Sequence, residues 1–208
     1  MTTDTPHRTD PPSTRKLTLA DISDLRAYEN EREDFREQVI QLKKRRRVGV
    51  GAHITFLFEN RDTMRFQIQE MARVEKIISD EGIENELRAY NPLIPEPGAL
   101  SATLFIELTS EPALRIWLPK LLGIETSVLL RLHDGSEVRC LAEESHASQL
   151  TRDEITAAVH YIRFEFTPEQ VEAFSEGPAT LVIDHPEYEE STTLSAETMA
   201  ELALDLGA

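Results

Sequence analysis

The chain has 208 residues, a hydrophobic fraction of 40% and a formal net charge of −16 at pH 7. This length and hydrophobic fraction support a folded core and exclude a chain that is disordered throughout. The negative charge disfavours nucleic acid and anionic membranes as partners, because the surface as a whole repels them.

The N-terminal segment, MTTDTPHRTDPPSTRK, lacks the apolar stretch that a secretory signal needs. We expect residues 1–15 to form a disordered leader, followed by a single α+β domain over residues 16–208. No apolar run approaches the roughly 20 residues that span a bilayer. The single cysteine, Cys140, excludes an intramolecular disulfide, so we expect a cytoplasmic protein.

The first half of the chain is predicted to be rich in helices. The segment LTLADISDL indicates a short first helix, with Thr18 as its N-cap and Asp21 in the capping-box position. A longer helix is expected from about Tyr28 to Arg46, where VGVG ends it. The elements expected next are a strand at 53–60, a helix from about 64 to Gly82, a short helix from 83, a strand at 101–108 and a helix at 111–123.

The second half is predicted to be rich in strands. The segment 126–143 favours a hairpin that turns at Asp134-Gly135. A strand at 156–167, a helix at 168–177, a strand at 178–186 and a closing helix at 195–206 follow. We therefore predict an α+β fold, in which a helix-rich N-terminal half packs with an antiparallel β-sheet from the C-terminal half. A subdivision near residue 124 stays open.

Sequence motifs for common enzyme chemistry are missing. The segment VGVGAH lacks the Lys-Ser/Thr ending of a P-loop, and GxSxG does not occur. The six histidines show neither HxxxH nor HxH spacing, so no cofactor is predicted. A composite metal site with His53, His185 and Glu70 is one interpretation, and an ordinary scatter of histidines is the other.

The densest cationic run lies at the end of the predicted long helix. It consists of Lys43, Lys44, Arg45, Arg46 and Arg47. Residues 168–208, by contrast, carry ten acidic residues and no Lys or Arg. The run is either a docking patch, for an acidic partner, for RNA or for this acidic tail, or a solvated helix end whose cations complement the helix dipole.

The stretch RFQIQEMARVEKI, residues 65–77, combines an apolar stripe with polar neighbours. The stripe is expected to consist of Met64, Ile68, Met71, Val74 and Ile78. The polar residues beside it indicate either a buried network or the boundary of the core. We interpret the stretch as a core helix whose polar flank is available to a partner.

Two further groups have a functional and a structural interpretation. In DHPEY, His185 is a candidate base or ligand with Asp184 as its orienting partner, although a strand-ending turn is the interpretation we favour. Beside Arg139, Cys140 is either a reactive thiol or, as we favour, a buried inert one.

Three segments of the chain are similar, in order, to one bacterial family. They are VGVGAHITFLFENRDTMRFQIQEMARVEKI, ELRAYNPLIPEPGALSATLFIEL and PATLVIDHPEY. The chain resembles the family called domain of unknown function 3501 from about Lys16 to Leu206. Members are often encoded near rubrerythrin-like and iron–sulfur oxidoreductase proteins, so the resemblance implies a redox or oxidative-stress setting and assigns no catalytic residue. The polar residues that we single out as a candidate functional cluster are Gln67, Glu70, Arg73, Glu75, Tyr90, Asn91 and His185.

These observations lead to three functional hypotheses. The first is a cytoplasmic, non-enzymatic accessory or interaction protein that acts with an iron–sulfur or rubrerythrin-like protein. The alternative is a metal-dependent or carboxylate-based enzyme in which Glu70, Glu75, His53 and His185 converge on a pocket. A third, RNA or DNA binding through Lys43 to Arg47, is disfavoured by the net charge. The oligomeric state is not predicted.

Overall fold

A computed structural model describes residues 15–143 and 155–207 of the chain. Its helices are α1 (Leu25–Arg46), α2 (Arg61–Glu75), α3 (Asp80–Tyr90), α4 (Glu111–Lys120), α6 (Pro168–Glu176) and α7 (Ala196–Leu206). Its strands are β1 (Arg47–Val50), β2 (Ile54–Glu59), β3 (Ala99–Ile106), β4 (Val128–Arg131), β5 (Glu137–Ala142), β6 (Val159–Glu165), β7 (Thr180–His185) and β8 (Tyr188–Thr193). Short 3-10 turns are η1 (Leu19–Asp21), η2 (Asn91–Leu93) and η3 (Ile124–Thr126).

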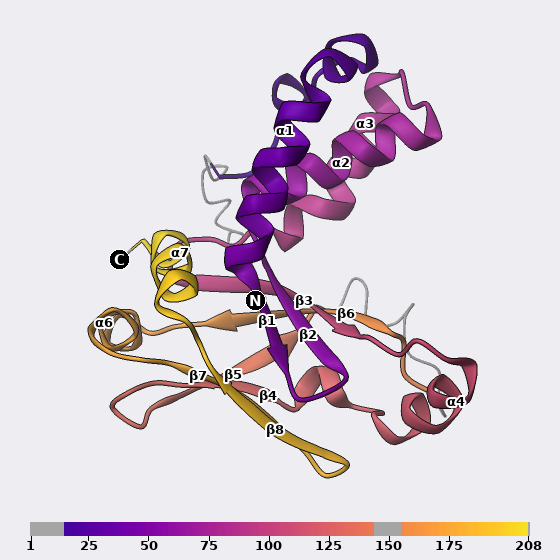
Figure 1. Ribbon diagram of the computed structural model, residues 1–208. Helices are drawn as coiled ribbons and strands as arrows, with labels where there is room; N and C mark the ends of the chain where they lie inside the picture. The colour runs from indigo at the N-terminus through magenta and orange to yellow at the C-terminus, as the bar shows by residue number, and fades with distance from the viewer. Residues whose placement is uncertain (1–14, 144–154, 208) are drawn as a thin grey trace, which may run out of the picture.

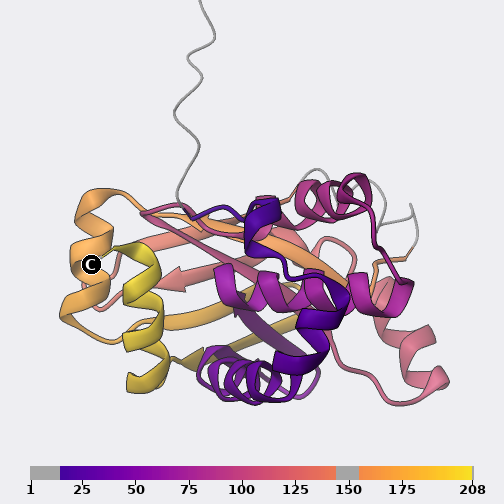
Figure 2. The same cartoon turned by 90° about the horizontal axis from the view of Figure 1, so that it is seen from above.

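The strands of the described residues form one antiparallel sheet in the order β1-β2-β3-β6-β5-β4-β7-β8. The sheet curls until its two edge strands, β1 and β8, lie close together, so that it forms a nearly closed barrel (Figure 1). Helices α1, α2 and α3 stand on one side of this barrel, and we call them the helical arm (Figure 1). Seen from above, α7 lies beside α1 (Figure 2).

Side-chain hydrogen bonds close the seam between β1 and β8. The Tyr188 hydroxyl donates to the carbonyl of Val50 and accepts from the backbone N–H of His53, both at 2.9 Å. Gly51 in the β1–β2 turn has φ +64°, and a Cβ there would lie 2.4 Å from the Tyr188 hydroxyl oxygen. The close approach of Tyr188 therefore requires a glycine at position 51, on steric and conformational grounds together.

The hydrophobic core fills the barrel, and the residues of β2 alternate between this core and the outer face of the sheet. Ile54, Phe56 and Phe58 belong to the barrel core, as the two-residue period of a strand requires. Every residue of β2 is buried, including those on the opposite face. That outer face is buried because it lies beneath the helical arm, where α1 packs against β2.

Within the arm, the polar side of α2 holds α1 in place. Gln69 is fully buried; its amide oxygen accepts from the N–H of Ser23 at 2.7 Å, and its amide nitrogen donates to the Ser23 carbonyl at 3.2 Å. Glu70 accepts from the Tyr28 hydroxyl at 2.7 Å and from two Arg32 nitrogens at 2.8 and 2.9 Å. These hydrogen bonds from Arg32, with that from Tyr28, lower the pKa of Glu70 against the opposing effect of burial. Both side chains are therefore engaged in holding the arm together.

The predicted apolar stripe on α2 is right in its first half and wrong in its second. Met64 and Ile68 are buried, but Val74 and Ile78 are 69% and 86% exposed. Helix α2 ends at Glu75, and Lys76 turns the chain with φ 56°, so the helical period stops before Ile78. The buried face continues through Ala72.

Other element predictions need correction. The first predicted helix is a single 3-10 turn, η1, although both the N–H and the hydroxyl of Thr18 donate to Asp21 as the capping pattern indicated. The segment expected only to end α1 is strand β1, and β8 was missed. Helix α2 begins at Arg61, with Asn60 as its cap, rather than at about residue 64, and it ends at Glu75 rather than at Gly82. The leader lies almost wholly outside the described residues.

The α+β class is confirmed, but the sheet does not come from the C-terminal half alone, as was expected. Strands β1 to β3 come from the N-terminal half and join those of the C-terminal half in one sheet. Within the described residues, no helix is both long enough and apolar enough to cross a membrane.

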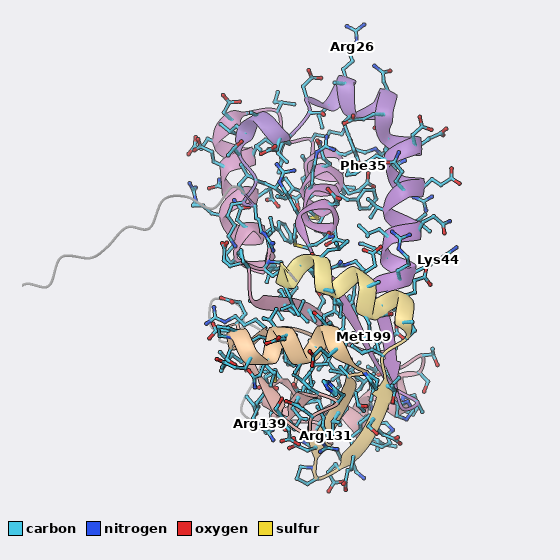
Figure 3. All side chains as sticks on the ribbon, turned by 90° about the vertical axis from the view of Figure 1, so that its left-hand side faces the viewer. Arg26, Phe35, Lys44, Arg131, Arg139 and Met199 are labelled. Carbon is cyan, nitrogen blue, oxygen red and sulfur yellow. The ribbon has the colours of Figure 1, made fainter. Side chains whose placement is uncertain are left out.

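A buried arginine connects the arm, the barrel and the last helix. Arg46 is 1% exposed, and its guanidinium donates to the carbonyls of Phe58 at 2.8 Å and Glu59 at 3.2 Å. It also forms an ion pair with Asp205 of α7. Figure 3 shows α7 at the level where the arm meets the barrel. A buried cation must be fully paired to be tolerated, so these contacts fix the relative position of three elements.

Arg46→Met is expected to lower the free energy of unfolding by about 3–5 kcal/mol, because it strands the Asp205 carboxylate and two strand carbonyls in a buried site. Urea denaturation at neutral pH measures the change. The control is Lys44→Met, two residues away on the exposed side of α1, which should change stability by no more than about 0.5 kcal/mol. Equal losses in the two variants would contradict the role of Arg46.

Candidate functional site

A cavity of about 260 Å³ lies where the outer face of the sheet meets the helical arm. We call it the Glu59 cavity. Its residues come from α1, α2, α3 and η2 on one side and from β2, β3 and β6 on the other. The apolar lining is Leu57, Met64, Leu93, Phe105 and Val159, and the polar lining is Lys43, Glu59, Gln67, Tyr90, Thr103 and Tyr161.

Glu59 is the most unusual of these side chains. It is 4% exposed, and its Oε1 accepts a hydrogen bond from the Thr103 hydroxyl at 2.7 Å. Its Oε2 is buried and accepts no hydrogen bond from the described residues. A buried polar atom without a partner costs free energy, and a buried ionised carboxylate costs more. Glu59 thus carries a buried, unsatisfied acceptor and is at the same time one of the residues that line the cavity.

The strand pattern explains how Glu59 reaches this position. Glu59 is the last residue of β2 and lies on the same outward face as Leu57. Asn60 then caps α2, so the chain leaves the sheet directly above this side chain. Thr103, whose partner across β3–β6 is Tyr161, supplies the hydrogen bond from the neighbouring strand.

Tyrosines complete the polar side of the cavity. Burial raises the pKa of Tyr161, and the nearby Tyr90 and Glu59 raise it further. The phenol therefore stays neutral at physiological pH and can act as a hydrogen-bond donor. Tyr90, at the end of α3, and Gln67, on α2, add a second phenol and an amide.

The structure brings only part of the predicted polar cluster to this cavity. Gln67 and Tyr90 line it. Glu70 binds Tyr28 and Arg32, as described above, and Arg73 pairs with Glu29 at 2.5 Å.

The other members of the predicted cluster lie elsewhere. Glu75 is exposed at the end of α2. The Asn91 side chain bonds both backbone groups of Leu17, at 2.8 and 2.9 Å. At the end of β7, His185 Nε2 lies 3.0 Å from the Leu122 carbonyl and Nδ1 accepts from the N–H of Glu187 at 3.2 Å. These contacts hold turns and connections in place.

The cationic run serves several parts of the structure. Lys43 lines the Glu59 cavity, and Lys44 points outward from the base of α1 (Figure 3). Arg45 pairs with Glu201 of α7 at 2.5 Å, beside the Arg46–Asp205 pair. Arg47 pairs with Glu107 at 3.2 Å and lies over the ring of Phe105. Part of the acidic tail is therefore an internal partner of this run.

The candidate metal ligands are not assembled into a site. The His53 ring packs against Trp117, with ring centroids 4.9 Å apart, beside the barrel seam. Glu70 lies in the helical arm, and Glu75 lies at the end of α2. Across residues 15–143 and 155–207, no group of three or more His, Cys, Asp or Glu side chains is placed to hold a metal ion.

Cys140 has the environment of an unreactive thiol. It is 5% exposed, and its S–H donates to the carbonyl of Glu125 at 3.2 Å. Burial raises its pKa to about 11, because the interior disfavours a thiolate. At neutral pH the side chain is therefore a protonated, buried thiol.

Glu59, the residue with the unsatisfied carboxylate oxygen, was not among the residues predicted from the sequence. It lies at the end of a strand that was predicted correctly, yet a glutamate at a strand end is usually solvated. The sequence feature that could have indicated Glu59 is its place on the outer face of β2, which it shares with Leu57. That position implies burial only if a second layer covers the face, and the sequence did not show where the arm would lie.

Comparison with known proteins places the chain in a family. No curated protein was found to match it. A crystal structure titled a novel protein of unknown function, from Burkholderia pseudomallei K96243, is 39% identical to it; the match covers 92% of this chain and 99% of that chain, with a TM-score of 0.85. The family described as "Protein of unknown function (DUF3501)" matches residues 16–206. The chain therefore belongs to the DUF3501 family, as its resemblance to that family predicted.

Proposed function

We propose that this protein is a small-molecule-binding accessory protein and that its ligand occupies the Glu59 cavity. The observation that carries the proposal is the buried Oε2 of Glu59, which no described residue satisfies. Ligand sites combine an apolar lining with a few convergent polar groups, and this cavity has both. A ligand that donates to Oε2 would supply the hydrogen bond that no described residue makes to this atom.

Binding fits the lining better than catalysis does. Glu59 is the sole carboxylate among the lining residues, and neither His nor Cys is among them. Acid–base enzymes commonly use a pair of titratable groups with well-separated pKa values. An enzyme built on Glu70, Glu75, His53 and His185 would need these side chains to converge. Because Glu70 is engaged with α1, and His185 with the Leu122 carbonyl and the N–H of Glu187, we do not propose that site.

The accessory role in a redox setting is supported by the family resemblance alone. In that role the protein would carry or sense a small molecule beside an iron–sulfur or rubrerythrin-like protein. Affinity purification of the full chain from its native host, with identification of co-purifying proteins, is expected to recover such a partner. If the chain purifies alone under several salt conditions, the redox-partner part of the proposal fails and the binding part is unaffected.

Glu59→Gln is expected to raise the free energy of unfolding of the ligand-free protein by about 1 kcal/mol, because it removes a poorly solvated charge and changes the side-chain shape little. Urea denaturation at neutral pH measures this change. The control is Glu107→Gln, an exposed glutamate paired with Arg47, for which no gain is expected. A clear loss of stability in Glu59→Gln would show that Glu59 has a structural role.

Ligand binding itself is tested by thermal-shift measurements. The compounds are small alcohols, amines, carboxylates and amino acids, and the proteins are the wild type and the cavity-filling variant Val159→Phe. At least one class should raise the melting temperature of the wild type, since a ligand at 100 times its Kd stabilises a protein by about 2.7 kcal/mol. The same class should have little effect on Val159→Phe. No shift in the wild type, or equal shifts in both proteins, would contradict the proposal.

A further inference from the structure

We infer that the Glu59 cavity selects a small zwitterion, such as an amino acid, whose ammonium group binds Glu59 and whose anionic group binds Lys43. This inference rests on the proposed binding function and specifies its ligand. The observation behind it is that two residues of opposite charge, Glu59 and Lys43, line one cavity, while neither forms an ion pair in the described part of the chain.

The negative end of the cavity suits a primary ammonium group. Oε1 of Glu59 is occupied by the Thr103 hydroxyl, which leaves Oε2 as the free acceptor. Three aromatic residues, Tyr90, Phe105 and Tyr161, also line the cavity. Aromatic rings attract cations, and an ammonium group has three N–H donors to share among a carboxylate and nearby oxygens.

A divalent metal ion fits this lining poorly. Calcium and magnesium sites usually draw on several oxygen ligands that include more than one carboxylate, and the cavity contains only Glu59. Lys43 adds a positive charge to the same lining, which opposes a doubly charged cation further. A monovalent ammonium group is the cation that one carboxylate can neutralise.

Lys43 is set apart from the arginines that follow it. Arg45, Arg46 and Arg47 each form an ion pair, with Glu201, Asp205 and Glu107 respectively. Within the described residues Lys43 has no carboxylate at ion-pair distance; its ammonium lies 5.5 Å from the centroid of the Phe66 ring. The three arginines therefore form internal ion pairs, whereas Lys43 lines the cavity without such a pair among the described residues and lies over Phe66.

Glu59 and Lys43 do not satisfy each other. They come from different elements, β2 and α1, and they form no ion pair in this structure. A ligand with a single charge would complete one of them and face an unfavourable charge at the other. A zwitterion complements both. The cavity volume of about 260 Å³ and the apolar Leu57, Met64 and Val159 suit a short aliphatic chain between the two charged groups.

Isothermal titration calorimetry on the full chain tests the inference. The zwitterionic probes are L-alanine, L-valine, β-alanine and 4-aminobutyrate, and the singly charged probes are propylamine and propionate. At least one zwitterion is expected to bind the wild type tenfold or more tightly than either singly charged probe. Propylamine or propionate binding as tightly as every zwitterion would overturn the inference.

Two variants assign the two ends of the ligand. Glu59→Gln should weaken the best zwitterion tenfold or more. Lys43→Met should weaken it as well, yet leave propylamine binding unchanged or stronger, because the repulsive charge is gone. Lys44→Met, one residue along on the exposed side of α1, is the matched control and should bind as the wild type does. Wild-type affinity in folded Glu59→Gln and Lys43→Met proteins would contradict the assignment.

The inference and the binding function fail in different ways. If no zwitterion binds, but another class of compound shifts the wild type and not Val159→Phe, the zwitterion is wrong and the binding function stands. If no compound of any class binds, both are wrong. The ligand comparison needs only the wild type, so it remains decisive even if a variant does not fold.

Discussion

The buried guanidinium of Arg46 is the contact on which the arrangement of the molecule depends. Helix α1 ends at this residue and strand β1 begins at the next, so the arm enters the barrel without a flexible connection. Arg46 holds the carbonyls of Phe58 and Glu59 where β2 leaves the sheet, and it holds Asp205 of α7. One cation thereby sets the angle of the arm and the position of α7, because a buried charge tolerates no loss of its partners.

The same junction creates the conditions for the cavity. With the arm held over the outer face of the sheet, the outward side chains of Leu57, Glu59 and Thr103 lose their contact with water. The Thr103 hydroxyl donates a hydrogen bond to Glu59, which replaces part of the lost hydration. A carboxylate has more acceptor capacity than one hydroxyl can satisfy. Natural proteins tend to concentrate such local costs at functional sites. Gln69 differs from Glu59, because both its amide oxygen and its amide nitrogen form hydrogen bonds with the backbone of Ser23. This fold can therefore pair a buried polar side chain at both of its polar atoms.

The charged residues near the base of α1 pair within the protein, although the net charge of the chain is strongly negative. The net charge of −16 does not describe the junction, where arginines from one short run meet acidic residues from the last helix. These pairs join residues that are 156 and 159 positions apart in the chain, so they contribute to tertiary structure, and they engage Arg45 and Arg46 within the protein rather than with nucleic acid. Lys43, in the same run, lines the Glu59 cavity instead of forming an ion pair with another described residue, and we assign it a role in ligand binding.

The sequence by itself determined the elements whose patterns are local. The hairpin at Asp134-Gly135, the helix that follows Thr167 and the closing helix after Ser195 were all predicted, because turn and capping chemistry act within a few residues. Only the tertiary structure decided which strands pair with each other and which faces of the helices and strands are covered. Strand β8 became part of the sheet through pairing with β7 and through the Tyr188 contacts with the first hairpin, and the second half of the α2 stripe stayed exposed because nothing covers it in the described structure. Gln67 and Tyr90 could be named from the sequence, whereas Glu59 could not, because its burial depends on a helical layer that tertiary contacts, including those of Arg46, hold over the sheet.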